Sequence, residues 1–227
     1  MNLKKVKKYW KAFWHFIWEE DSFLSWLANI VLAFVLIKFV IYPGLGLILG
    51  TSHPVVAVMS SSMEHGGEFD NWWDNDFAVC EERTPCTQKY FYAINNITLD
   101  QFSEFRFKNG FNTGDIMLIV GARPDKIKIG DVIVYWANEP VPIIHRVIAR
   151  FQENGQIYFR TKGDNNPGLN YNEVKIESKL ILGKAVVRIP YLGWVKIGFV
   201  KLLDGVTGCI SAHGAEVYKC FVPNAGA

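Results

Sequence analysis

The hydrophobic pattern begins with one long apolar run, and shorter apolar runs follow it. Residues 23–50 read FLSWLANIVLAFVLIKFVIYPGLGLILG, and the stretch to Tyr42 has about the 20 residues that a helix needs to cross a bilayer. Lys38 lies near the far end of this stretch, where a long side chain reaches the interface. The pattern therefore predicts a transmembrane anchor over 23–50, with Tyr42 and Pro43 at its exit.

The flanking charges predict how this anchor is oriented. Five lysines precede the first acidic residue, at positions 4, 5, 7, 8 and 11. By the positive-inside rule, residues 1–22 stay in the cytoplasm, and everything after residue 50 lies outside a cell membrane that the chain crosses once. A buried core helix and a cleaved signal peptide are the alternatives, but no small-x-small cleavage site follows the run closely.

Beyond the anchor, the apolar runs are short and separated by Gly, Pro and Asn turns, which is typical of antiparallel strands. The predicted strands are 54–60, 112–121, 128–137, 142–151, 156–163 and 179–190. The fold class is therefore mainly β, an antiparallel sheet on a single N-terminal transmembrane helix, with a β-rich domain over 51–190.

Residues 64–111 interrupt this pattern and are interpreted as an insertion. They are rich in aromatic and acidic residues, and only 97–105 has a helical pattern, with Thr98 as its cap. Paired tryptophans suit a bilayer interface, so the segment FDNWWDNDF (69–77) is expected to act at the membrane or on substrate. The alternative is a local core beneath the loop.

The C-terminal segment, 191–227, begins with apolar residues interrupted by charges. The pattern over 191–208 favours an amphipathic helix that lies on protein or on the membrane over a second span.

Composition limits the remaining possibilities. The chain has 227 residues, half of them apolar, which is enough for one folded domain, and its net charge of +2 is too small to indicate nucleic acid. Four cysteines permit two local disulfides, Cys80 with Cys86 and Cys209 with Cys220. The alternative of a zinc site lacks a CxxC spacing, so no metal and no cofactor are expected.

Three polar side chains are candidates for catalysis. Ser62 follows a predicted strand in a turn, His145 lies within an apolar strand, and Asp164 follows the next strand. A serine hydroxyl is a poor nucleophile until a base takes its proton, and an imidazole oriented by a carboxylate is such a base. Nucleophilic catalysis by serine is therefore the favoured chemistry.

These motifs resemble those of type I signal peptidases of the archaeal and endoplasmic-reticulum kind. The segments SSSMEH, GDIMLIV, GDVIVYW, PIIHRV and TKGDNN occur in the order found in that family. The resemblance implies a β-rich peptidase domain that cuts signal peptides from secreted proteins at the outer membrane surface. It implies that Ser62 is the nucleophile, that His145 is the general base, and that the hydroxyl of Ser60 helps to bind the oxyanion.

The chain departs from the family pattern where the third catalytic residue is expected. Many family members have a second aspartate six residues after the one in GDNN, and this sequence has Asn170 there. Asp164 is therefore the favoured acid, Glu173 is the second candidate, and a dyad of Ser62 and His145 is the third possibility. His65 also stands where the family usually has proline.

The resemblance also implies partners. These are the signal peptides of secretory pre-proteins and membrane lipid, with the protein-translocation machinery as a candidate and no nucleic acid. The alternative function is a catalytically inactive, membrane-anchored binding subunit with the same fold.

Overall fold

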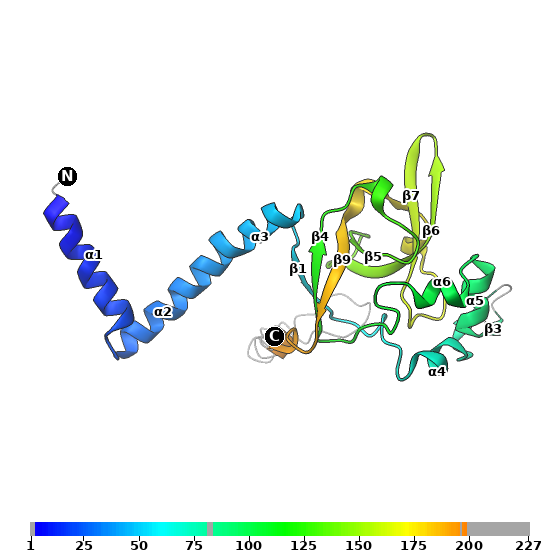
Figure 1. The fold of residues 1–227 in the computed structure, drawn as a ribbon, viewed down its shortest axis with the longest axis horizontal. Helices are drawn as coiled ribbons and strands as arrows, with labels where there is room; N and C mark the ends of the chain where they lie inside the picture. The colour runs from blue at the N-terminus through cyan, green and yellow to red at the C-terminus, as the bar shows by residue number, and fades with distance from the viewer. Residues whose placement is uncertain (1–2, 81–83, 196, 199–227) are drawn as a thin grey trace, which may run out of the picture. The chain divides into compact units, whose positions relative to one another are not determined.

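A computed structural model describes residues 3–80, 84–195 and 197–198 of the chain. The chain separates into two compact units, residues 1–48 and residues 49–227. The first unit is helical, and the second contains the sheet (Figure 1). Most of the predicted C-terminal helix over 191–208, and the pair Cys209 and Cys220, lie outside the described residues.

The apolar run forms one continuous helical stretch, as its composition predicts. Its parts are α2 (Phe23–Leu36), the π-helical turn η1 (Ile37–Ile41) and α3 (Tyr42–Leu49), and they follow α1 (Leu3–Trp18). Together they span 27 residues, and an 18-residue window within them has a mean hydropathy of 2.3. Within the described part of the chain, this is the one helix that is long and apolar enough to cross a bilayer.

The helix continues past Pro43 to Leu49. A proline inside an α-helix lacks an N–H donor and crowds the carbonyl four residues earlier. Here the π-helical turn precedes Pro43, and the N–H of Tyr42 bonds to the carbonyl of Ile37, five residues back. The wider turn accommodates the proline without ending the helix.

The second unit is built on a seven-stranded sheet in which every strand pair is antiparallel. The strands lie in the order β1 (Val55–Ala57), β4 (Ile116–Val120), β9 (Ile181–Ile189), β5 (Val132–Tyr135), β6 (Ile143–Glu153), β7 (Gln156–Lys162) and β8 (Ile176–Glu177). Short helical turns connect them, namely η3 (Pro124–Lys126), α7 (Tyr171–Val174) and η4 (Ser178–Leu180). The predicted mainly β class is confirmed.

Two Gly-Asp turns start strands β4 and β5. Gly114 and Gly130 have φ of 88° and 89°, a conformation that glycine adopts without strain. The aspartate after each glycine accepts a hydrogen bond from a backbone N–H three residues earlier, Asn112 to Asp115 at 2.8 Å and Lys128 to Asp131 at 3.0 Å. The local sequence therefore fixes where each strand begins.

The insertion folds into short elements of its own: α4 (Phe69–Trp73), β2 (Ala78–Val79), β3 (Pro85–Cys86), α5 (Gln88–Ile94) and α6 (Leu99–Ser103). Thr98 caps α6 through a capping box with Gln101, which confirms that prediction. A disulfide joins Cys80 to Cys86, with Cα atoms 5.9 Å apart.

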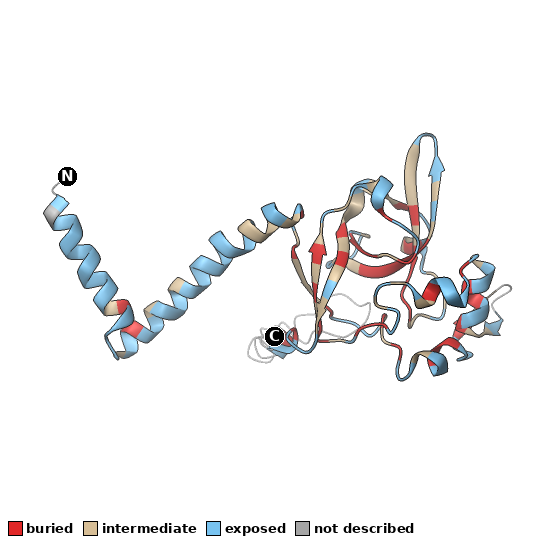
Figure 2. Cartoon of the chain, viewed as in Figure 1, coloured by how far each residue is buried: buried red, intermediate tan, exposed pale blue. Residues whose placement is uncertain are grey.

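An aromatic core holds these short elements together. Trp72 and Trp73 are each only 4% exposed, and they pack with Phe91, Tyr92 and Phe102. Figure 2 shows buried segments on these helices. The expectation that the paired tryptophans face a membrane is therefore wrong, and the local-core alternative is correct. Their surroundings are aromatic rings, which shield the indoles from solvent.

Removing one of these rings tests the core. Trp73→Ala leaves a cavity, so we expect the free energy of unfolding to fall by about 3–5 kcal/mol in a denaturant titration. Phe77→Ala, in the same insertion but at a side chain 48% exposed, is the control and should leave stability near that of the wild type. Unchanged stability in Trp73→Ala would contradict the buried core.

Candidate active site

Ser62 lies in the turn that follows β1. Ser60 and Ser61 are exposed, whereas Ser62 is half-buried and Met63 is fully buried. The hydroxyl oxygen of Ser62 is 2.9 Å from Nε2 of His145 and 3.2 Å from the hydroxyl oxygen of Ser60. The buried methionine anchors the turn, so the serine hydroxyl stands at the protein surface within hydrogen-bonding distance of an imidazole.

His145 lies on β6 and is 6% exposed. Its Nδ1 atom forms an ion-pair contact with Oε1 of Glu173, whose side chain is fully buried. Neither atom has another hydrogen-bond partner among the described residues. A carboxylate at Nδ1 favours the tautomer with its proton there, which leaves Nε2 free to accept the proton of Ser62.

Glu173 reaches His145 from the short helix α7. The sequence starts this helix at Asn170, whose backbone N–H donates to Oε2 of Glu173 at 2.6 Å. This contact is one half of a capping box, a pattern that fixes a glutamate side chain against the helix N-terminus. One carboxylate oxygen thus holds the helix start, and the other faces the imidazole. Asn170 contributes its backbone N–H to this helix cap.

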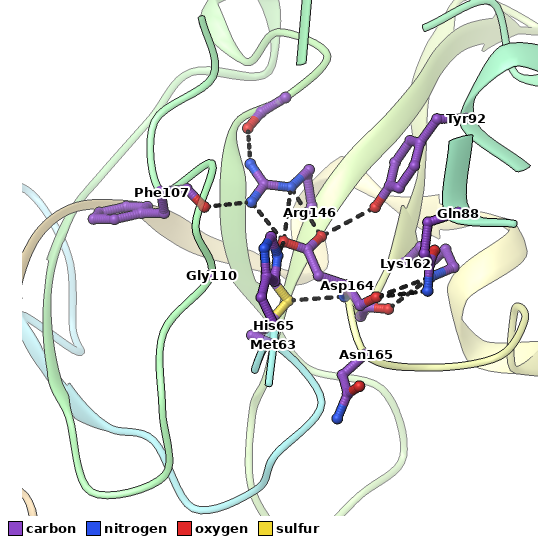
Figure 3. A network of polar contacts seen from close by, with 12 residues as sticks. Met63, His65, Gln88, Tyr92, Phe107, Gly110, Arg146, Lys162, Asp164 and Asn165 are labelled. Carbon is purple, nitrogen blue, oxygen red and sulfur yellow. Dashed lines mark hydrogen bonds and ion pairs between the residues drawn. The ribbon is translucent and has the colours of Figure 1, made fainter. Parts of the chain in front are cut away.

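Asp164 does not contact the imidazole of His145. This arrangement differs from the expectation that Asp164 is the acid of the triad. Its carboxylate accepts hydrogen bonds from Arg146, at 2.9 Å from Nε and 2.6 Å from Nη2, and from the Tyr92 hydroxyl at 3.1 Å. Its Oδ2 atom is 3.0 Å from Nε2 of His65 (Figure 3). Its ionic partner is therefore Arg146 and not His145.

The ion pair between Arg146 and Asp164 is fully buried on both sides. Burial would by itself raise the pKa of Asp164, but the Arg146 guanidinium and the His65 hydrogen bond outweigh it and hold the pKa well below its usual range. The remaining guanidinium donors bond to backbone carbonyls of Arg106, Phe107 and Gly130. The buried charges are thus paired and hydrogen-bonded, as burial requires.

Lys162 is a second buried cation in this network. Its ammonium group donates to the side-chain oxygen of Gln88 at 3.2 Å and to the carbonyls of Gly163 and Asp164. Burial lowers the pKa of Lys162 to about 8, because the neighbouring carboxylates only partly offset the loss of water. The lysine therefore remains a donor at neutral pH.

The turn that contains Asp164 contacts Ser62 through the residues on both sides of Asp164. The N–H of Asn165 donates to the carbonyl of Ser62 at 2.7 Å, and its side-chain amide donates to the carbonyl of Ser61 at 3.1 Å. A Cβ atom on Gly163 would lie 2.8 Å from both Nε2 of His145 and the carbonyl oxygen of Ser62. Only glycine permits this close approach.

Sequence reasoning missed several residues of this network, namely Gln88, Tyr92, Arg146 and Lys162. Arg146 and Lys162 are paired across β6 and β7, and two cations at facing positions of apolar strands are a signal for a buried counter-charge. The part of the chain that the structure describes contains no group of three or more His, Cys, Asp or Glu side chains arranged to hold a metal ion.

The chain is similar to proteins named as catalytic subunits of the signal peptidase complex. The chain is 39% identical to the human signal peptidase complex catalytic subunit SEC11C over 95 residues, which cover 38% of this chain and 49% of that protein. It is 27% identical to the Schizosaccharomyces pombe catalytic subunit sec11 over 191 residues, which cover 79% of this chain and 85% of that protein. No protein-family model matches the chain.

The match spans about half the length of the mammalian relatives. The fold and the motifs are similar to those of type I signal peptidases. More closely, the chain is similar to proteins named as catalytic subunits of the signal peptidase complex. The resemblance drawn from the sequence motifs is confirmed.

The buried ion pair predicts a stability effect of Asp164→Asn. The substitution leaves Arg146 buried without its counter-charge, so we expect the free energy of unfolding to fall by about 3–5 kcal/mol at pH 7. Asp125→Asn removes a solvent-exposed partner of Arg123 and is the control, which should leave stability unchanged.

The ion pair between Arg146 and Asp164 also predicts how the stability difference between wild type and Asp164→Asn depends on pH. Because the pKa of Asp164 is lower in the folded than in the unfolded protein, its stabilisation is complete above the unfolded value of about 3.9 and is lost as the pH falls below it. The gap between wild type and Asp164→Asn should therefore shrink on acidification. Equal stability of the two proteins at pH 7 would contradict the pairing.

Proposed function

We propose that this protein is a membrane-anchored serine endopeptidase that removes signal peptides from secretory pre-proteins. The observation that carries the proposal is the hydrogen-bonded line from Ser62 through His145 to Glu173. A hydroxyl, an imidazole and a carboxylate in this order are the groups that acyl transfer requires. The relatives are named catalytic subunits of the signal peptidase complex, and this supports signal peptides as the substrate class.

In the proposed reaction, Nε2 of His145 takes the proton of Ser62 as the serine oxygen attacks the carbonyl carbon of the scissile peptide bond. The imidazolium then gives this proton to the leaving amine, and water hydrolyses the acyl-enzyme by the same route. Glu173 holds the imidazole tautomer and offsets the charge that forms on the ring. A glutamate is suited to this role because both of its oxygens are already oriented.

The oxyanion of the tetrahedral intermediate needs donors that point at the developing charge. We propose the hydroxyl of Ser60, together with the backbone N–H of Ser62. The distance of 3.2 Å between the two serine hydroxyl oxygens is consistent with Ser60 lying beside the reacting carbonyl. Both serines lie at the protein surface, where an extended peptide has access.

Cleavage of a pre-protein with an Ala-x-Ala site, by the full chain in detergent micelles, tests the activity. We expect wild type to cut once after the second alanine, and Ser62→Ala and His145→Ala to be inactive, because a nucleophile and its base act as a unit. Glu173→Gln should lower kcat by about 10⁴-fold, as loss of the triad acid does in the serine-protease template. Glu139→Gln, at an exposed glutamate, is the control and should cleave like wild type.

Two results would contradict this assignment. A folded wild-type chain that does not cleave any such pre-protein would favour the inactive binding subunit. Near-normal kcat in Glu173→Gln would leave a dyad of Ser62 and His145 without a third member.

The proposed topology has residues 1–22 in the cytoplasm and the β-rich unit on the opposite side of the membrane, because the N-terminal segment carries five lysines before any acidic residue. Protease added outside intact cells, or inside the lumen of vesicles derived from the reticulum, should digest residues 51–227 and leave the N-terminal segment protected. Protection of the β-rich unit instead would reverse the topology.

A further inference from the structure

The insertion over residues 64–111 does more than form a separate core. Three of its side chains, His65, Gln88 and Tyr92, reach out of that core to Asp164 (Figure 3). The Tyr92 hydroxyl and His65 bond to the carboxylate, and the Gln88 amide donates to the backbone carbonyl at 3.2 Å. Gln88 and Tyr92 are 1% and 0% exposed, so water does not compete for these contacts.

The residue that the insertion holds is the centre of the turn that contacts the nucleophile. Gly163, on one side of Asp164, lies against both His145 and Ser62, and Asn165, on the other side, donates to the carbonyl of Ser62. These contacts leave no room for the turn to shift independently of the serine. A displacement of Asp164 therefore changes the distance between Ser62 and His145.

The insertion also contacts the segment that leads from this turn to the triad carboxylate. The N–H of Val79 donates to the carbonyl of Pro167 at 2.7 Å, and Leu169 packs on the aromatic core. The next residue is Asn170, which starts the helix that carries Glu173. Both ends of the segment between Asp164 and Glu173 are thus fixed, one by the insertion and one by the helix cap.

The hydroxyl of Tyr92 is not needed to fill the aromatic core. Its ring packs on Trp73 and Phe102 with centroid distances of 5.5 and 4.8 Å, contacts that a phenylalanine ring also makes. Burial and the neighbouring carboxylate raise the pKa of Tyr92 well above its usual value, so the hydroxyl stays protonated and donates. This hydroxyl donates a hydrogen bond to Asp164 at 3.1 Å.

We propose that the insertion is an intramolecular clamp for the catalytic turn, and that Tyr92 and Gln88 are positioning residues of the reaction. This inference rests on the proposed function. The clamp acts on the geometry between Ser62 and His145 and touches no substrate. Loosening it should therefore lower kcat and leave KM nearly unchanged, since small misplacements of reacting groups are costly in rate.

The test compares Tyr92→Phe with Tyr90→Phe in the full chain. Tyr90 lies on the same helix, α5, but is 52% exposed, so it is the matched control. We expect Tyr92→Phe to lower kcat by about ten- to a hundredfold, with KM within about twofold of wild type. The melting temperature should stay well above the assay temperature, and Tyr90→Phe should match wild type in all three values. If Tyr92→Phe does not fold, Gln88→Met replaces it, because this variant removes the hydrogen bond from Gln88 to the Asp164 carbonyl.

The outcomes separate this inference from the proposed function. No cleavage by folded wild type contradicts the proposed function, and the inference falls with it. Cleavage by wild type with unchanged kcat in Tyr92→Phe contradicts the clamp alone. A fall in kcat that only follows the fraction of unfolded protein would show a purely structural role and would also overturn the inference.

Discussion

The candidate active site depends on one buried ion pair, between Arg146 and Asp164. Two charges removed from water destabilise a fold unless they are paired and their remaining hydrogen-bonding groups are satisfied. Here the guanidinium is satisfied by the Asp164 carboxylate and by three backbone carbonyls. This requirement holds strand β6, the turn after β7 and the end of the insertion in one arrangement, because each supplies atoms to the pair.

The two carboxylates near the serine have different surroundings, and this difference separates their roles. The Arg146 guanidinium neutralises the charge of the Asp164 carboxylate. Asp164 is therefore poorly suited to stabilise a positively charged imidazole. Glu173 contacts the His145 imidazole and a backbone N–H. The proposed triad therefore uses Glu173, while Asp164 keeps the turn in place. The helix cap at Asn170 holds the Glu173 carboxylate beside the imidazole.

Much of the fold could be predicted from local sequence. The sequence predicts the strands that follow a Gly-Asp turn and those that lie between Gly and Asn turns. It can do so because a few neighbouring residues determine these turns. The short helices α4 and α5 were not found, since five and seven residues give too little periodicity and their stability comes from packing of aromatic rings.

The pairing of acids with bases could not be predicted in the same way. Successive residues of a strand point to opposite faces, so His145 and Arg146 send their side chains to different partners. The sequence has two candidate acids after His145, namely Asp164 and Glu173. It does not specify which of them lies on the same face of the sheet as His145. That assignment depends on the path of the chain after β7 and on the packing of the insertion, both of which are tertiary features.

The tautomer of His145 is the most direct test of the central claim, that Glu173 and not Asp164 orients the catalytic base. It can be read from ring nitrogen shifts in protein labelled with ¹⁵N-histidine, with His145→Gln used for assignment. We expect a proton on Nδ1 of His145 in the wild type and loss of this single tautomer in Glu173→Gln. The same tautomer in Glu173→Gln, together with its loss in folded Asp164→Asn, would show that Glu173 does not orient the base.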